Sequence, residues 1–189
     1  FLSTLFDLLC WAIITTGISG LFRLGELTTA RTGAPFPLRS HLTFVSPTHA
    51  RLHLPTSKTD TQHRGVDVVI HCNHSPTSAI RALRAYLHLP PASVGGLTLP
   101  SLPLFIIESR AGAVPCTRSA FITRMRDALQ SAGLNPSQYS GHSLRKGGAQ
   151  SLFDAGVEIA NIACAGRWAQ GSTSIRLYRS LSQHARGQW

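Results

Sequence analysis

The stretch Gly141-His142-Ser143-Leu144-Arg145-Lys146-Gly147-Gly148 places an imidazole and a guanidinium three residues apart. Side chains at this spacing share one face of a helix, so a helix beginning near Ser143 would bring His142 and Arg145 together. A proton-transfer group beside a forked cation suits a site that acts on a phosphate. The stretch therefore predicts such a site, and the segments around it decide its nature.

Helical periodicity on both sides of this stretch predicts where it lies in the fold. A capping residue at Thr117 and a closing Gly133 bound a regular apolar stripe before it. Gly166-Arg167-Trp168 forms a turn after it, and a last helix then carries Tyr178. We expect helices over about 117–132, 143–155 and 157–165, and one that begins within 172–174.

The first segment is apolar enough to raise the question of a membrane span. Its helical spacing predicts a helix to about Thr16, which Gly17 and Gly20 then break. Asp7 and two threonines interrupt the apolar run, which favours a buried helix over a membrane span or a signal peptide. The chain starts at Phe1, without Met, and we expect it to be a fragment of something longer.

Short strands follow the first helices. Three runs of strand type cover 41–45, 50–54 and 66–72, and they predict a small antiparallel sheet. The polar hairpin loop between the last two runs carries Lys58. Ser75 and Pro76 have the residue types that begin a helix, and residues 104–107 form a short buried piece.

Length and composition fit one globular domain. The chain has 189 residues, of which 43% are hydrophobic and 14% charged, so it can bury a core and is not of a disordered type. We expect a single domain over residues 1–189, of the α+β class, mostly helical, with a small three-stranded antiparallel sheet.

The charge balance indicates a polyanionic partner. Lys and Arg number 18 against 8 Asp and Glu, which gives a net charge of +10. This excess points most simply to nucleic acid. Only Lys58 and Lys146 are lysines, so arginine carries nearly all the charge, and arginine grips phosphate oxygens with two donors at once.

Neither the cysteines nor the carboxylates predict a metal site. The four cysteines are far apart, without Cys-x-x-Cys, and we interpret them as reduced thiols of an intracellular protein. His71-Cys72-Asn73-His74 lacks a second ligand pair at a zinc spacing. The few scattered carboxylates disfavour two-metal nuclease chemistry. We expect no metal and no cofactor.

Several polar residues that packing does not readily explain are similar, in order and context, to the catalytic domain of the tyrosine recombinases. The resemblance lies in Gly20-Leu21-Phe22-Arg23-Leu24-Gly25-Glu26-Leu27, the hairpin lysine Lys58, His142-x-x-Arg145, Gly166-Arg167-Trp168 and Tyr178. His-Ser-Leu-Arg-Lys-Gly-Gly-Ala followed by Gly-Arg-Trp most resembles recombinases of eukaryotic mobile elements of the Crypton and DIRS type. The resemblance spans residues 20 to about 181. It implies that the helical domain preceding the catalytic one in this family is absent from this chain.

Phosphodiester chemistry assigns roles to several of these residues. An attacked phosphodiester gathers negative charge on its non-bridging oxygens, and the guanidiniums of Arg23 and Arg145 are the candidates to stabilise it. The phenol of Tyr178 must lose its proton to attack, and nearby imidazole and arginine groups would favour the phenolate. The resemblance adds Glu26, which would brace His142 or Arg23.

The resemblance also implies what the other residues do. Tyr178 would form a 3′-phosphotyrosine link and release a 5′-hydroxyl. Lys58 would supply the proton to the leaving oxygen, and His142 would act as a general acid and base. Trp168 would occupy the position that many relatives fill with His, and would donate its ring N–H to a phosphate oxygen.

Further basic residues are candidates for binding the DNA backbone, or they form a solvated face. Arg64 is also an alternative to Lys58 as the loop cation. The candidates are Arg64, Arg124, Lys146, Arg167, Arg176 and Arg179.

Each catalytic candidate has a structural alternative. Tyr178 and Trp168 are alternatively core aromatics, and His142 is alternatively a helix cap. Arg145 alternatively pairs with Asp154 or Glu158, and Arg23 with Glu26 alternatively forms a simple ion pair within a helix.

The sequence thus predicts a metal-independent tyrosine recombinase that cleaves and rejoins DNA through Tyr178. We expect double-stranded DNA and further copies of the chain, as a dimer or tetramer, as partners, with no membrane and no nucleotide cofactor. We expect a nuclear location. The alternatives are a type IB topoisomerase-like enzyme and a DNA-binding module that has lost the chemistry. An RNA-directed enzyme lacks a supporting cluster of stacking aromatic residues.

Overall fold

The computed structural model describes residues 4–29, 35–56, 64–71, 75, 77–89, 98–109, 112–169, 172, 173 and 175. Helices make up about half of these residues, beside two small antiparallel sheets, so the α+β class is confirmed. Four of the candidate site residues lie outside the described residues. They are Lys58, Arg176, Tyr178 and Arg179.

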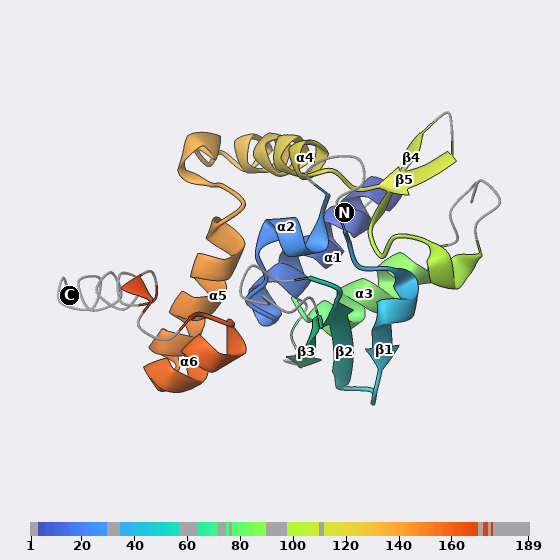
Figure 1. Cartoon of the computed structure of the whole chain (residues 1–189). Coiled ribbons are helices and arrows are strands. Elements are labelled where there is room, and N and C mark those ends of the chain that lie inside the picture. Colours follow the sequence, from blue (N-terminus) through green and yellow to red (C-terminus); the bar gives the residue numbers. More distant parts are fainter. Residues whose placement is uncertain are drawn as a thin grey trace.

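Helix α1 (Leu5–Ser19) runs through the middle of the fold and contacts α3, α4, α5 and β3 (Figure 1). Its N-cap Thr4 accepts a hydrogen bond from the backbone N–H of Asp7. The prediction that the helix ends at about Thr16 was wrong. Gly17 continues it, because an added Cβ there would lie 3.0 Å from Leu144 of α5, so the small residue allows close helix packing. Gly20 is the C-cap.

The predicted three-stranded sheet is confirmed. Its order is β1 (Leu42–Phe44), β2 (His49–Leu54) and β3 (Val66–His71), with both pairs antiparallel. Alternate residues of β2 and β3 enter the larger of two hydrophobic cores, called here the main core. Side chains from α1 and α3 also lie in the main core.

Helix α3 (Ala79–His88) begins three residues later than Ser75 and Pro76 predicted. Ser78 is its N-cap residue, with extended backbone angles. Its buried side includes Tyr86, whose hydroxyl accepts a hydrogen bond of 3.0 Å from the backbone N–H of Ile106.

A second sheet was not predicted. Strands β4 (Ile106–Ser109) and β5 (Gly112–Pro115) pair antiparallel, and the sequence had suggested only a buried piece at 104–107. Elsewhere in the described part of the chain, three short 3-10 helices cover Arg39–His41, Leu99–Ser101 and Pro136–Gln138. The predicted helix after Thr117 is confirmed as α4 (Arg118–Ser131), with Thr117 accepting from the backbone N–H of Ala120.

Two further helices form a smaller core on the other side of α1 from the three-stranded sheet (Figure 1). They are α5 (Ser143–Asp154) and α6 (Ile159–Ala165), close to the predicted ranges. This smaller core, called here the second core, consists of Leu21, Ala149, Phe153, Ile162 and Ile175. Its Leu21 follows directly on the end of α1, so the two cores meet at one turn of the chain.

Within the described residues, no helix is both long and apolar enough to cross a membrane.

Replacing Gly148 with alanine is expected to lower the free energy of unfolding by about 1–3 kcal/mol. A Cβ at this position of α5 would lie 2.4 Å from the Ile18 carbonyl oxygen and 2.7 Å from a Leu21 methyl carbon. Helices α1 and α5 would have to separate to admit it. Urea unfolding followed by circular dichroism measures the change.

The neighbouring Gly147 provides a matched control, because it is exposed in the same helix and no atom would lie within 4 Å of an added Cβ. Gly147→Ala is expected to stabilise the protein by about 0.5–1 kcal/mol through helix propensity. Equal effects of the two substitutions would contradict the close contact at Gly148.

Candidate functional site

The turn between α1 and α2 (Leu24–Leu27) is the centre of the candidate site. Leu21 has a φ of 50°, in the left-handed region that a non-glycine residue rarely adopts. This conformation places the Leu21 side chain, which is 1% exposed, in the second core. The carbonyl of the same residue accepts hydrogen bonds from two arginines that come from distant parts of the sequence.

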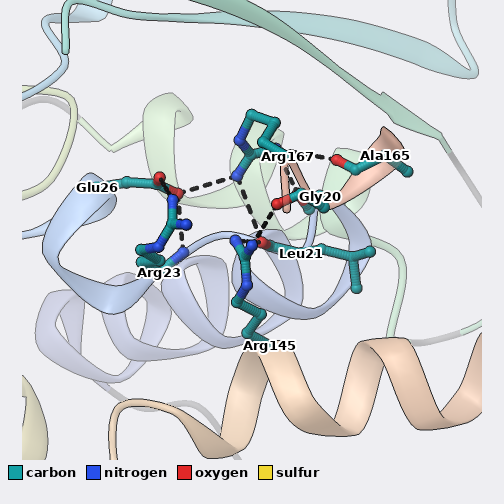
Figure 2. A network of polar contacts seen from close by, with 8 residues as sticks. Gly20, Leu21, Arg23, Glu26, Arg145, Ala165 and Arg167 are labelled. Carbon is teal, nitrogen blue, oxygen red and sulfur yellow. Dashed lines mark hydrogen bonds and ion pairs between the residues drawn. The ribbon is translucent and has the colours of Figure 1, made fainter. Parts of the chain in front are cut away.

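Arg145 reaches this turn from α5 and is 3% exposed (Figure 2). One terminal nitrogen donates to the Leu21 carbonyl at 2.7 Å, and the other donates to the Gly166 carbonyl. Bonds from a charged donor are stronger than neutral ones, and here they offset part of the cost of burying a guanidinium. Backbone carbonyls therefore hold this arginine.

Arg23 stands at the N-cap of α2 and is paired with Glu26. Its guanidinium donates to Glu26 Oε1 at 2.7 Å, and its backbone N–H donates to Glu26 Oε2 at 2.8 Å. The Arg23 side chain is 24% exposed, whereas that of Glu26 is 6% exposed. The expectation that Glu26 braces Arg23 agrees with these contacts, as does the simpler reading of an ion pair within one helix.

Arg167 follows α6 and joins the same group of residues. One terminal nitrogen donates to the Gly20 and Ala165 carbonyls, both at 3.1 Å. The other donates to the Leu21 carbonyl at 3.3 Å and to Glu26 Oε2 at 2.9 Å. Figure 2 shows Arg145 and Arg167 approaching the turn from opposite sides.

Trp168 completes this group by stacking on Arg145. The guanidinium carbon of Arg145 lies 3.9 Å from the centroid of the Trp168 ring, at cation–π distance. Trp168 also packs against the second core. We call the five residues Arg23, Glu26, Arg145, Arg167 and Trp168 the arginine cluster.

The carboxylate of Glu26 stays ionised inside the arginine cluster. Burial alone would raise the pKa of Glu26, but Arg167, and then the backbone and side chain of Arg23, lower it below its ordinary value. Burial lowers the pKa of Arg167, and Glu26 opposes that effect. Two guanidiniums therefore contact this one carboxylate, and with Arg145 the cluster as a whole is positive.

The cluster contacts given above involve none of the other sequence-predicted residues that the structure describes. His142 is exposed at the N-cap of α5, where its side chain makes no capping hydrogen bond. Lys146 and Arg64 are exposed. Arg124 pairs with Asp7 of α1, with Nε 3.1 Å from Oδ1, and this contact raises the pKa of the guanidinium.

The described residues contain no group of three or more His, Cys, Asp or Glu side chains that could hold a metal ion. Cys10, Cys116 and Cys164 carry free thiols. Burial raises the pKa of both Cys10 and Cys116 to about 12, so these two thiols stay protonated at neutral pH.

Sequence reasoning missed the part played by the Leu21 carbonyl and the internal contacts of Arg167. A backbone acceptor leaves no signal in a residue pattern. A signal for Arg167 was present, because it stands between Gly166 and Trp168 in a turn. An added Cβ at Gly166 would lie 1.7 Å from the Trp168 ring, which shows how closely that turn is packed.

No protein-family model matches the chain, and no curated protein matches it.

Replacing Glu26 with glutamine is expected to lower the free energy of unfolding at pH 7 by about 3–5 kcal/mol, because it leaves a buried guanidinium without its counter-charge. The pKa of Glu26 is lower in the folded than in the unfolded state. Its stabilising contribution is therefore complete above the unfolded pKa and is lost as the pH falls through the folded pKa. The variant should lose less stability than the wild type between pH 7 and pH 3, as measured by urea unfolding.

Glu158→Gln serves as the control, since Glu158 is exposed. It is expected to change the stability at pH 7 by less than about 1 kcal/mol. The same pH dependence in Glu26→Gln as in the wild type would refute an ionised, stabilising Glu26.

Proposed function

We propose that the protein cleaves and rejoins DNA strands through a covalent link to Tyr178, in the manner of the tyrosine recombinases. The observation that supports this proposal most strongly is the arginine cluster. Arg23 and Arg145 are 122 positions apart in the sequence, yet Arg145 donates to the Leu21 carbonyl, two residues before Arg23. Arg167 contacts both this carbonyl and Glu26, which accepts from the Arg23 guanidinium. The resemblance relies on these two residues for binding the reacting phosphate.

The electrostatics of the cluster suit this chemistry. A five-coordinate phosphorus carries more negative charge than the starting phosphodiester, so fixed positive groups stabilise it more than they stabilise the substrate. Fixed guanidiniums in a water-poor place act more strongly than exposed ones. The net charge of +10 would also attract a polyanionic duplex.

The tyrosine would come from the segment after the second core. Ile175, three residues before Tyr178 in the sequence, is 6% exposed and belongs to the second core together with Leu21. The chain therefore returns to the neighbourhood of the cluster just before the proposed nucleophile. In this proposal Lys58 donates the proton to the leaving 5′-oxygen, and His142 exchanges protons with the reacting groups.

Double-stranded DNA is the proposed substrate, and further copies of the chain are the proposed partners in recombination. Integration or excision of a mobile element in the nucleus would use this reaction. The phosphotyrosine link conserves the energy of the broken bond, so rejoining would need no nucleotide cofactor.

A nicked duplex provides the test, because loss of a short fragment after cleavage traps the covalent intermediate. The duplex is first selected by the protein from a random-sequence pool. The wild type should then form a species that migrates as a protein–DNA adduct in a denaturing gel, and Tyr178→Phe should form none. Arg145→Lys should lower the rate of adduct formation by about 100-fold or more, as expected for loss of a hydrogen-bond donor to the transition state.

Tyr139→Phe is the matched control, because Tyr139 is a half-buried tyrosine next to the main core. It should form the adduct as the wild type does. Binding of the selected duplex without any adduct would instead favour a DNA-binding module. Relaxation of supercoiled DNA without sequence preference would favour a topoisomerase.

A further inference from the structure

We propose that Arg167 is a positioning residue, which holds Arg23 and Arg145 in a fixed relation through Glu26 and the Leu21 carbonyl, and that it does not bind the DNA backbone. The inference rests on the proposed function, because it takes Arg23 and Arg145 as the groups that bind the reacting phosphate.

The terminal nitrogens of Arg167 are fully engaged within the protein. They carry four hydrogens, and four protein acceptors lie within hydrogen-bond distance: three carbonyls and one carboxylate oxygen. The remaining donor, Nε, is buried and has no hydrogen-bond partner within the described part of the chain. The side chain is 10% exposed, and one face of its guanidinium lies over the Phe22 ring, 5.0 Å from the centroid. These contacts use all four terminal hydrogens of Arg167, and Nε is buried, so no donor of this residue remains for a DNA phosphate.

The backbone of Arg167 directs its side chain inward. Its φ is 58°, in the left-handed region that is unfavourable for a residue with a Cβ relative to glycine. Its N–H donates to the Cys164 carbonyl at 3.0 Å, as expected after the end of a helix. The side-chain contacts offset the cost of this conformation.

Two of the four hydrogen bonds of Arg167 end on a group that also holds one of the two proposed phosphate-binding arginines. Glu26 Oε2 accepts from Arg167 and from the Arg23 backbone, while Oε1 of the same carboxylate accepts from the Arg23 guanidinium. The Leu21 carbonyl accepts from both Arg167 and Arg145. Arg167 thus connects Arg23 with Arg145, although it touches neither of them through a hydrogen bond in the described structure.

Losing this connection would let the two guanidiniums move relative to one another. A displacement of about 1 Å at a reacting centre can lower a rate by about 100-fold. A residue that binds the DNA backbone would act differently. Its removal weakens DNA binding and makes the negative slope of log binding constant against log salt concentration less steep by about 0.9. A positioning role changes the rate of adduct formation and leaves the salt dependence of binding unchanged, whereas a DNA-backbone contact does the reverse.

The experiment compares wild type, Arg167→Met and Arg167→Lys on the selected duplex. For both variants, the salt slope of binding should equal that of the wild type. The rate of adduct formation at saturating DNA should fall by about 100-fold in both variants. Lysine should not restore the rate, because one ammonium group cannot make the several hydrogen bonds of a planar guanidinium. Arg126→Met, at an exposed position of α4, should keep the wild-type adduct rate. A salt slope lowered by about 0.9 in Arg167→Met, with an unchanged rate, would overturn the proposal.

A second measurement needs neither catalysis nor a folded variant. Guanidinium hydrogens that are bonded inside a protein exchange slowly with water, so NMR of the wild type without DNA should show slow exchange for Arg167. Fast exchange that slows only when duplex is added would overturn the proposal. If the wild type forms no adduct while Arg167 exchanges slowly and the salt slope of Arg167→Met is unchanged, the proposed function fails and the internal role of Arg167 stands.

Discussion

The structure depends on how two buried guanidiniums are satisfied at a single backbone carbonyl. A carbonyl oxygen has two lone pairs, and the Leu21 oxygen uses them for Arg145 and Arg167. A buried cation without acceptors would cost several kcal/mol, so both arginines require this carbonyl to face them. The left-handed conformation of Leu21 meets that requirement while its side chain enters the second core. Core packing and charge satisfaction therefore act on the same residue.

The spacing between α1 and α5 sets the geometry of this arrangement. Two small residues permit the close approach, since Gly17 faces Leu144 and Gly148 faces the Ile18 carbonyl. Arg145 lies between these contacts along α5, and it projects toward the end of α1 (Figure 2). A larger side chain at either glycine would move the guanidinium away from the turn. The positions of the polar groups thus follow from how closely two apolar helix faces can pack.

Much of this fold could be predicted from the sequence, because local signals carry it. Thr117 and Gly20 mark helix ends by their own chemistry, and the spacing of Arg23 and Glu26 already indicated their pairing. The three-stranded sheet could be predicted because apolar residues alternate along its strands. Each of these features is decided within a few residues, where sequence patterns are most informative.

The features that were not predicted are decided by distant contacts. Gly17 was expected to break a helix, but Leu144 packs against it and the helix continues. The short strands β4 and β5 stabilise each other, and neither is long enough to show a clear period. The direction of Arg167 depends on acceptors about 140 positions away, so a pattern of charges could indicate a basic residue but not whether it faces solvent.

The charge distribution of the arginine cluster explains why positioning and phosphate binding can be separate tasks there. Glu26 is the one acid among its five residues, and its lowered pKa keeps it ionised beside Arg167 and Arg23. Without Arg167, this carboxylate would offset most of the charge of Arg23 and weaken its attraction for an anion. With Arg167 present, the carboxylate is shared, and more of the positive charge of Arg23 remains to act on a phosphate. An internal arginine can therefore strengthen the field at a site without touching the substrate, because it determines how the available negative charge is divided.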